Sequence, residues 1–214
     1  MSCWALSAGV CLFGLLGVMV AEYLGNLRLR TVSKITASLA MLAFACCLGG
    51  TQTGPGKIFV AGLVLSIVGD VFLLWPKTHF LQGIGAFLLA HCLYVCGFLF
   101  LGVDWAGVGF AAFLIAPITW MVWRWLVPHT GELKWAIAAY LFAISAMACL
   151  SIGALWVEPG QAQQVLLMAA ALFCISDLFV ARDKFIVSQH RNVWVGLPIY
   201  YLAQLGFGLG AGLI

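Results

Sequence analysis

Two aspartates lie inside long apolar segments of the sequence, and their position predicts chemistry. Asp70 is embedded in Leu65–Leu74, and Asp177 is embedded in Leu172–Ala181. A carboxylate inside a membrane span costs at least about 2.5 kcal/mol, so such residues usually face the interior of a helix bundle and serve a function. Two carboxyls at one depth do not both ionise easily, and a protonated acid beside a carboxylate suits general acid–base catalysis.

The same pair of aspartates fits more than one class of membrane protein. An enzyme would use the pair for acid–base chemistry. A proton-coupled transporter or lipid flippase would use it to carry protons. Composition and spacing alone favour these two classes equally, whereas a purely structural or interaction protein leaves the two charged residues unexplained.

The composition indicates that the elements positioning these aspartates lie in a membrane. The chain has 214 residues, of which 64% are apolar and 8% are charged, whereas soluble domains have about 45–50% and about 25%. So few charges cannot cover a soluble protein of this size. The composition therefore excludes a soluble globular enzyme, a disordered chain and a nucleic-acid binder, and it predicts an integral membrane protein.

Eight segments are apolar and long enough to be candidate transmembrane helices, each near the length of about 20 residues that a span needs. We therefore expect an all-α fold in which residues 1–214 form one transmembrane domain with no long polar linker. The first segment lacks the basic residues that precede a signal peptide, so we expect it to stay in the mature protein. The eight segments are Cys3–Leu24, Ile35–Gly50, Ile58–Trp75, Phe80–Leu101, Gly107–Val127, Trp135–Val157, Val165–Ala181 and Val193–Leu213.

The basic residues predict how the spans are oriented. The connections after spans 1, 3, 5 and 7 hold nine of the ten Lys and Arg residues, and the opposite side has Lys57 alone. By the positive-inside rule the first set is cytoplasmic, and both termini are then external. A bacterial inner membrane is the expected location of this short chain.

The two aspartates also share a local pattern. Each follows a small residue and precedes an apolar residue and a phenylalanine, and the two helices run in the same direction. The pattern is compatible with a parallel four-plus-four repeat. Asp70 lies five residues before Trp75 and Asp177 five before Arg182, so both are expected about 8 Å inside the cytoplasmic boundary.

Other polar side chains in the spans are expected to line one cavity with the aspartates. His91 and Tyr94 share a helix face, as do Tyr201 and Gln204, because residues three apart are neighbours on a helix. The eight cysteines lie mostly in apolar runs without a CxxC pair, so we expect them to be free and buried. A single histidine in the spans is too few for a zinc site, and no metal or cofactor is expected.

An ordered set of residues resembles the YhhN-like family of multi-pass membrane proteins, the lysoplasmalogenases. The resemblance extends from Lys34 to Gln204. It rests on Gly69 and Asp70, then Phe80, Gly83, Phe87, His91 and Tyr94, then Tyr140 and Met147, then Phe173, Ser176 and Asp177, and finally Tyr200, Tyr201 and Gln204.

This resemblance implies a hydrolase that cleaves the vinyl ether bond of lysoplasmalogens to a fatty aldehyde and glycerophospho-ethanolamine or -choline. Asp70 and Asp177 would be the catalytic pair, acting without a cofactor, and which of them is the acid stays open. The partners would be the lysophospholipid and membrane lipids, not nucleic acid, and the oligomeric state is left open. The residues expected to bind substrate are Lys34, Ser66, His91, Tyr94, Tyr140, Ser176, Tyr200, Tyr201 and Gln204.

Lys34 is the residue expected to receive the substrate's phosphate as a positive group. Tyr140, Tyr200 or Tyr201 would face a choline or ammonium head group through cation–π contact.

Overall fold

The computed structural model describes residues 2–214, and in this part of the chain it contains eight long α-helices and no strand. All eight are long and apolar enough to cross a membrane, so the expectation of an all-α, multi-pass membrane protein is confirmed. Two short 3₁₀ turns lie between α5 and α6, and a π-helical turn, Arg182–Ile186, follows α7. The helices are α1 (Cys3–Leu24), α2 (Leu27–Cys47), α3 (Gly54–Phe72), α4 (Phe80–Leu101), α5 (Trp105–Leu126), α6 (Lys134–Val157), α7 (Gln161–Ala181) and α8 (His190–Leu213).

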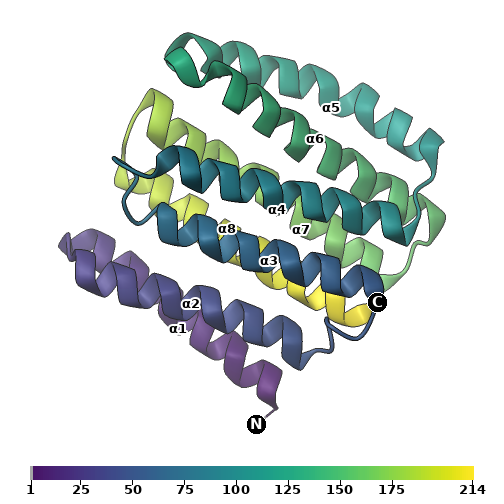
Figure 1. The fold of residues 1–214 in the computed structure, drawn as a ribbon, viewed down its shortest axis with the longest axis horizontal. Helices are drawn as coiled ribbons and strands as arrows, with labels where there is room; N and C mark the ends of the chain where they lie inside the picture. The colour runs from purple at the N-terminus through teal and green to yellow at the C-terminus, as the bar shows by residue number, and fades with distance from the viewer. Residues whose placement is uncertain (1) are drawn as a thin grey trace.

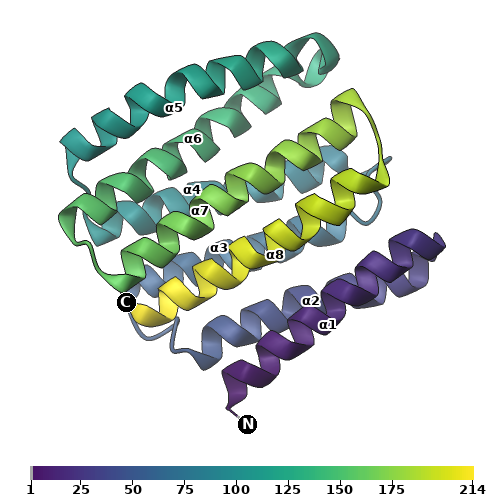
Figure 2. The same cartoon turned by 180° about the vertical axis from the view of Figure 1, so that it is seen from behind.

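Helices α1 and α2, α3 and α4, α5 and α6, and α7 and α8 pair as antiparallel hairpins (Figure 1, Figure 2). Five of the helices also close into a ring. In the ring α3 contacts α4, α4 contacts α6, α6 contacts α7, α7 contacts α8, and α8 returns to α3. The hairpin of α1 and α2 packs against α8 and α3, whereas α5 packs mainly on α6 at the outer edge. The ring therefore encloses the centre of the protein, with α2 and α5 on its flanks.

Aromatic side chains fill the centre of this ring. Phe59, Tyr94, Phe173 and Phe207 have no exposed surface, and the rings of Tyr94 and Phe207 stack with centroids 4.0 Å apart. Gly69, next to Asp70, leaves room for this packing, because a Cβ there would lie 2.6 Å from the ring of Phe87. Close packing of α3 on α4 therefore fixes the position of the first aspartate.

The second helix starts earlier than the sequence predicts. Its predicted start was Ile35, but α2 begins at Leu27 after a two-residue turn. Gly25 takes a left-handed conformation that ends α1, and the Asn26 side chain accepts a hydrogen bond from the Leu29 N–H. The basic residues after this turn are helical rather than part of a loop, because Lys and Arg are good helix formers. Lys34 consequently lies two turns inside the helix, and it is buried.

The expectation that all eight cysteines are free is wrong for two of them. Cys3 and Cys47 form a disulfide. They are 44 residues apart in the sequence, but the antiparallel hairpin of α1 and α2 brings the start of one helix beside the end of the other (Figure 1). The other six are free in the structure, namely Cys11, Cys46, Cys92, Cys96, Cys149 and Cys174. The expected burial is wrong for three of these, because Cys46, Cys92 and Cys96 are exposed.

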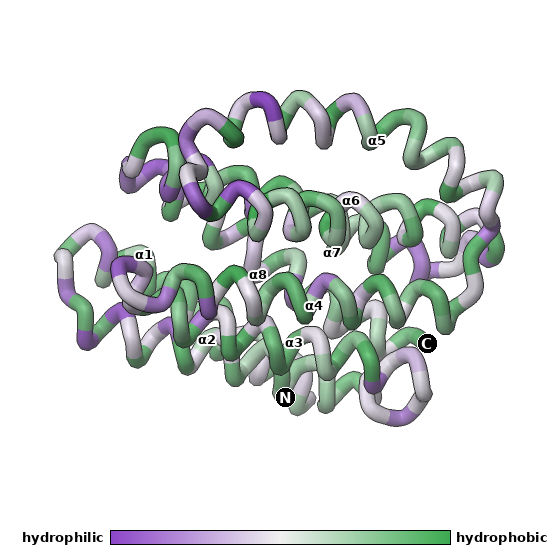
Figure 3. Tube along the Cα trace, turned by 45° about the horizontal axis from the view of Figure 1, so that its top comes forward, coloured by the Kyte–Doolittle hydropathy of each residue, from purple (hydrophilic) through white to green (hydrophobic). Residues whose placement is uncertain are grey.

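The connections α1–α2, α3–α4, α5–α6 and α7–α8 lie at one end of the bundle, which we call the basic end. Both termini lie at the opposite end (Figure 1). Apolar residues cover most of the helices, and hydrophilic residues gather at helix ends and connections (Figure 3). Which end faces the cytoplasm stays a prediction, as does the four-plus-four repeat.

Candidate active site

A cavity of about 620 Å³ lies between the helices toward the basic end. Its walls are mainly apolar, with Ile115, Ile118 and Val122 from α5 and Leu141 and Ile144 from α6. Residues of α2, α3, α4, α7 and α8 and of the α3–α4 and α7–α8 connections also line it. The polar residues of its lining include both aspartates, together with Lys34, Tyr140 and Tyr200.

Asp70 is almost fully buried and has three partners. The Lys34 ammonium lies 3.1 Å from its Oδ1. The Ser38 hydroxyl donates to its Oδ2 at 2.7 Å, and the Tyr200 hydroxyl donates to the same oxygen at 2.8 Å. These contacts join α2, α3 and α8, and a carboxylate is the form of Asp70 that accepts all of them.

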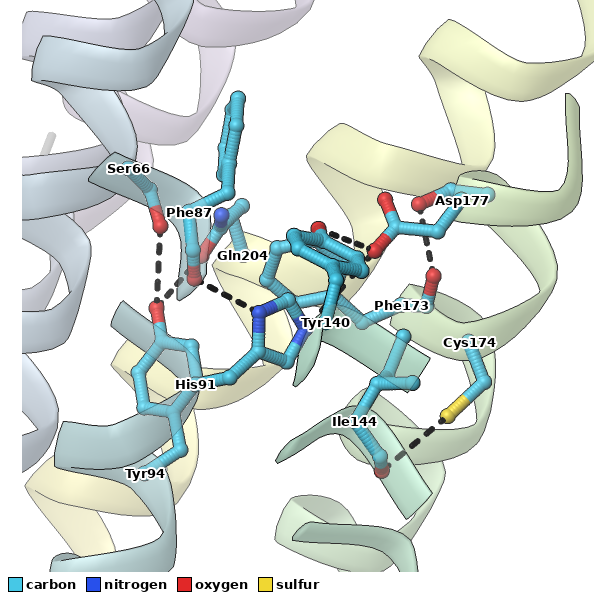
Figure 4. A network of polar contacts seen from close by, with 11 residues as sticks. Ser66, Phe87, His91, Tyr94, Tyr140, Ile144, Phe173, Cys174, Asp177 and Gln204 are labelled. Carbon is cyan, nitrogen blue, oxygen red and sulfur yellow. Dashed lines mark hydrogen bonds and ion pairs between the residues drawn. The ribbon is translucent and has the colours of Figure 1, made fainter. Parts of the chain in front are cut away.

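Asp177 has a different environment. Tyr140 donates its hydroxyl hydrogen to Oδ2 at 2.6 Å, and the Nε2 of His91 lies 3.8 Å from the same oxygen (Figure 4). Within residues 2–214 no lysine or arginine forms an ion pair with it. Its side chain is 16% exposed against 4% for that of Asp70. Asp177 is thus the carboxyl that opens more into the cavity.

The aspartates receive their partners from corresponding places in the two halves of the chain. Asp70 on α3 is bound from α2 and α8, and Asp177 on α7 is approached from α6 and α4. A four-plus-four repeat would relate α2 to α6 and α8 to α4. The partner types differ, however, because a lysine supports the first aspartate and a tyrosine and a histidine the second.

The other predicted polar residues pack behind the cavity wall instead of lining it. Tyr94 donates to Gln204 Oε1 at 2.9 Å, and its hydroxyl lies 3.4 Å from that of Ser66 (Figure 4). The Tyr201 hydroxyl donates to the Lys34 carbonyl oxygen at 3.3 Å. The remaining two, Ser176 and His91, are also fully buried. The Ser176 hydroxyl bonds to the Phe173 carbonyl oxygen, and the His91 ring bonds to the Phe87 carbonyl oxygen. Substrate contact by these six residues stays a prediction.

Lys34 and two tyrosines have partners other than those expected. The Lys34 ammonium, expected to meet a phosphate, contacts Asp70. Tyr140 and Tyr200, expected to face a head group, bond to the aspartates. Ser38 is the site residue that sequence reasoning missed, and its spacing of four from Lys34 would have indicated it once α2 is drawn from Leu27.

Positive side chains surround the mouth of the cavity at the basic end. Arg30, Lys77 and Lys184 all line it. Arg30 is paired with Glu22 at 3.5 Å. Lys184 lies 4.3 Å from the centre of the Phe80 ring. A molecule with an anionic group and a long apolar chain matches this distribution of charge.

Side chains of the kind that bind metals are too scattered to form a centre. Among residues 2–214 no three His, Cys, Asp or Glu side chains come together in a group that could hold an ion. The absence of a cofactor stays an expectation. The protein side chains of the cavity provide a carboxyl, a paired carboxylate and two tyrosine hydroxyls, which suit proton transfer to and from an apolar substrate.

A comparison with known families places this arrangement in a wider group. The sequence model of the YhhN family matches residues 29–211. The chain belongs to the YhhN family. This match covers α2 to α8 almost completely, including both aspartates and every predicted site residue, and it confirms the resemblance noted from the sequence.

Several curated proteins are similar to this YhhN family member along most of its length. Lysoplasmalogenase TMEM86A of Bos taurus is 31% identical over 169 residues, covering 75% of this chain and 67% of the relative. The lysoplasmalogenase of Mycobacterium bovis is 29% identical over 194 residues, covering 85% and 68%. Lysoplasmalogenase TMEM86B of Homo sapiens is 31% identical over 158 residues, covering 74% and 65%. No solved structure matches the chain.

Proposed function

We propose that the chain is a lysoplasmalogenase that hydrolyses the vinyl ether bond of lysoplasmalogens to a fatty aldehyde and glycerophospho-ethanolamine or -choline. The names of its relatives support this substrate class. The observation that carries the mechanism is the presence of Asp70 and Asp177 in one largely apolar cavity with unlike partners. Such a site keeps a reactive carboxyl against an apolar alkene.

Asp177 is the acid in this proposal. Hydrolysis of a vinyl ether begins with transfer of a proton to the β-carbon, which gives an oxocarbenium ion, and an undissociated acid must deliver that proton. Asp177 has no lysine or arginine partner in residues 2–214 and is the more exposed of the two carboxyls. Tyr140 orients it through the 2.6 Å hydrogen bond.

Asp70 is the negative member of the pair. The Lys34 ammonium lies 3.1 Å from its Oδ1, and the Asp70 carboxylate stabilises the positive charge of the oxocarbenium ion. Water then adds to the cation and gives its proton to the Asp177 carboxylate, forming a hemiacetal. When the hemiacetal collapses, its bond to the glycerol oxygen breaks, that oxygen takes the proton of Asp177, and the hemiacetal hydroxyl gives its own proton to Asp177 as the aldehyde forms. One water is consumed, and both carboxyls return to their starting states, as in the two-carboxylate logic of glycosidases.

The substrate spans the cavity from its mouth to its apolar wall. The phosphate lies among Arg30, Lys77 and Lys184, because these cations line the entrance. The alkenyl chain lies along the apolar side chains of α5 and α6. Entry from the cytoplasmic leaflet of a bacterial inner membrane follows if the basic end is cytoplasmic.

The function is tested with purified protein and a pair of lipids that differ in one double bond. We expect aldehyde release from 1-alkenyl lysophosphatidylethanolamine and none from its saturated 1-alkyl analogue, in the presence of a chelator. The saturated ether cannot be protonated at carbon. If the protein released neither aldehyde nor glycerophosphoethanolamine, and instead moved the alkenyl lipid across the membrane of proteoliposomes, hydrolysis would be refuted and a flippase favoured.

The chain-binding wall is tested by narrowing the cavity. Ile118→Trp puts a bulky ring into the wall formed by α5, so we expect KM to rise about tenfold for a long-chain lysoplasmalogen and little for a short-chain one. Phe113→Trp is the matched control on the same helix, because Phe113 is 78% exposed and does not line the cavity. Equal KM changes for both variants would contradict this placement of the chain.

A further inference from the structure

His91 is a fully buried histidine with one satisfied and one unsatisfied ring nitrogen. Its Nδ1 lies 2.7 Å from the carbonyl oxygen of Phe87. Its Nε2 is buried and has no hydrogen-bond partner within residues 2–214. This nitrogen points toward Asp177, whose Oδ2 lies 3.8 Å away (Figure 4). An unsatisfied buried polar atom is costly and calls for an explanation.

The contacts of His91 determine which nitrogen carries its hydrogen. A carbonyl oxygen only accepts, so Nδ1 is the donor to Phe87. In the neutral ring Nε2 is then a bare acceptor. The rings of Phe173 and Tyr140 enclose it, with centroids 4.6 and 5.1 Å from that of the imidazole. The Tyr140 hydroxyl is not available to Nε2, because it donates to Asp177.

We propose that His91 and Asp177 share one proton and that His91 is the positioning residue that keeps Asp177 in its acid form between turnovers. This inference rests on the proposed function and deepens it. Among residues 2–214, the Asp177 carboxyl is the group placed to supply a hydrogen to Nε2. The 3.8 Å separation is longer than a hydrogen bond, and contacts of this kind shorten when substrate is bound.

The proton balance of the pair follows the reaction. The shared proton leaves Asp177 for the β-carbon of the vinyl ether, and the pair is then a carboxylate facing a neutral imidazole. The proton released by the attacking water returns to the carboxylate and restores the hydrogen bond to Nε2. The lone pair of the His91 Nε2 repels the negative charge of the Asp177 carboxylate, so this carboxylate quickly takes up a proton again.

The His91–Asp177 pair would set the pH at which activity falls on the alkaline side of the pH profile. The other titratable side chains that face it are Tyr140 from α6, Cys174 from α7 and Tyr94 from α4, and groups of these types keep their protons at neutral pH. His91→Gln replaces the acceptor by an amide that can donate to Asp177. We expect the alkaline limb of kcat/KM to move down by about one to two pH units, the effect of one charge-assisted hydrogen bond.

His91→Phe is the matched variant, because it keeps a ring in the aromatic cluster but introduces no donor. Its alkaline limb should also move down, because Asp177 loses the acceptor that holds its proton, but by less than in His91→Gln, which adds a donor to the carboxylate; kcat should fall because proton recapture is slower. Equal limbs in wild type, His91→Gln and His91→Phe, with folded protein in each case, would show that His91 is only a packing residue and overturn the proposal.

A spectroscopic measurement separates this inference from the function itself. In protein with isotope-labelled histidine, nuclear magnetic resonance should show an Nε2 without hydrogen at neutral pH whose signal changes as the pH rises. Asp177→Asn should abolish that change, whether or not the chain hydrolyses lysoplasmalogens. A hydrogen on Nε2 rather than Nδ1, or the same titration in Asp177→Asn, would refute the shared proton while leaving the hydrolase intact.

Discussion

Asp177→Asn is expected to lower aldehyde release by at least about 100-fold, because general acid catalysis contributes about 10²–10⁴ to a rate. The asparagine amide keeps the size of the carboxyl, and its oxygen still accepts the Tyr140 hydrogen bond seen at 2.6 Å. It has no acidic proton to give to the alkene. The measurement is kcat with 1-alkenyl lysophosphatidylethanolamine, made on protein that elutes and melts as wild type does.

The matched control for this variant is Glu158→Gln. Glu158 is exposed just after α6, at the end of the bundle opposite the basic end, so the same change from carboxyl to amide should leave kcat unaltered. An Asp177→Asn protein that keeps more than a tenth of wild-type kcat would show that another group delivers the proton.

Lys34→Met is expected to have the largest effect on stability. It removes the ammonium that lies 3.1 Å from Asp70 and leaves that carboxylate buried without its counter-charge. Breaking one side of a buried ion pair costs about 3–5 kcal/mol. The free energy of unfolding in detergent should fall by this amount, and activity should fall with it. Lys57→Met is the matched control, because Lys57 is exposed at the opposite end of the bundle.

The double variant Lys34→Met with Asp70→Asn separates stability from catalysis. With both charges removed, the unpaired carboxylate is gone, and we expect most of the lost stability to return. Activity should not return, because the negative charge that stabilises the oxocarbenium ion is also gone. A double variant that is no more stable than Lys34→Met, or that regains activity, would contradict the role given to the ion pair.

The two aspartates were predictable because charge inside an apolar run is expensive, so its position is informative without any structure. Their partners were not. The sequence treats Asp70 and Asp177 as equivalent, whereas the structure gives Asp70 a lysine and leaves Asp177 with a tyrosine and a histidine. Lys34 was expected to meet a phosphate, because the charged segment before Ile35 reads as a loop.

The lining of the cavity was only partly predictable, for a geometric reason. Helical spacing shows that His91 and Tyr94 share a face, but it does not show whether that face meets a cavity or a neighbouring helix. Both turn into the aromatic core. The Cys3–Cys47 disulfide was missed for a related reason, since the packing of a hairpin rather than cysteine spacing brings the two together.

The most direct test of the central claim follows the isotopes of water into the products. The reaction is run in deuterated, oxygen-18-labelled water, and the aldehyde is trapped by reduction. The masses of both products are then measured by mass spectrometry. If Asp177 delivers a proton to the β-carbon and water attacks the neighbouring carbon, the aldehyde carries one deuterium next to its carbonyl. The glycerophospho product then has no heavy oxygen, and Asp177→Asn gives neither product. Heavy oxygen in the glycerophospho product, or an aldehyde without deuterium at that carbon, would contradict the mechanism.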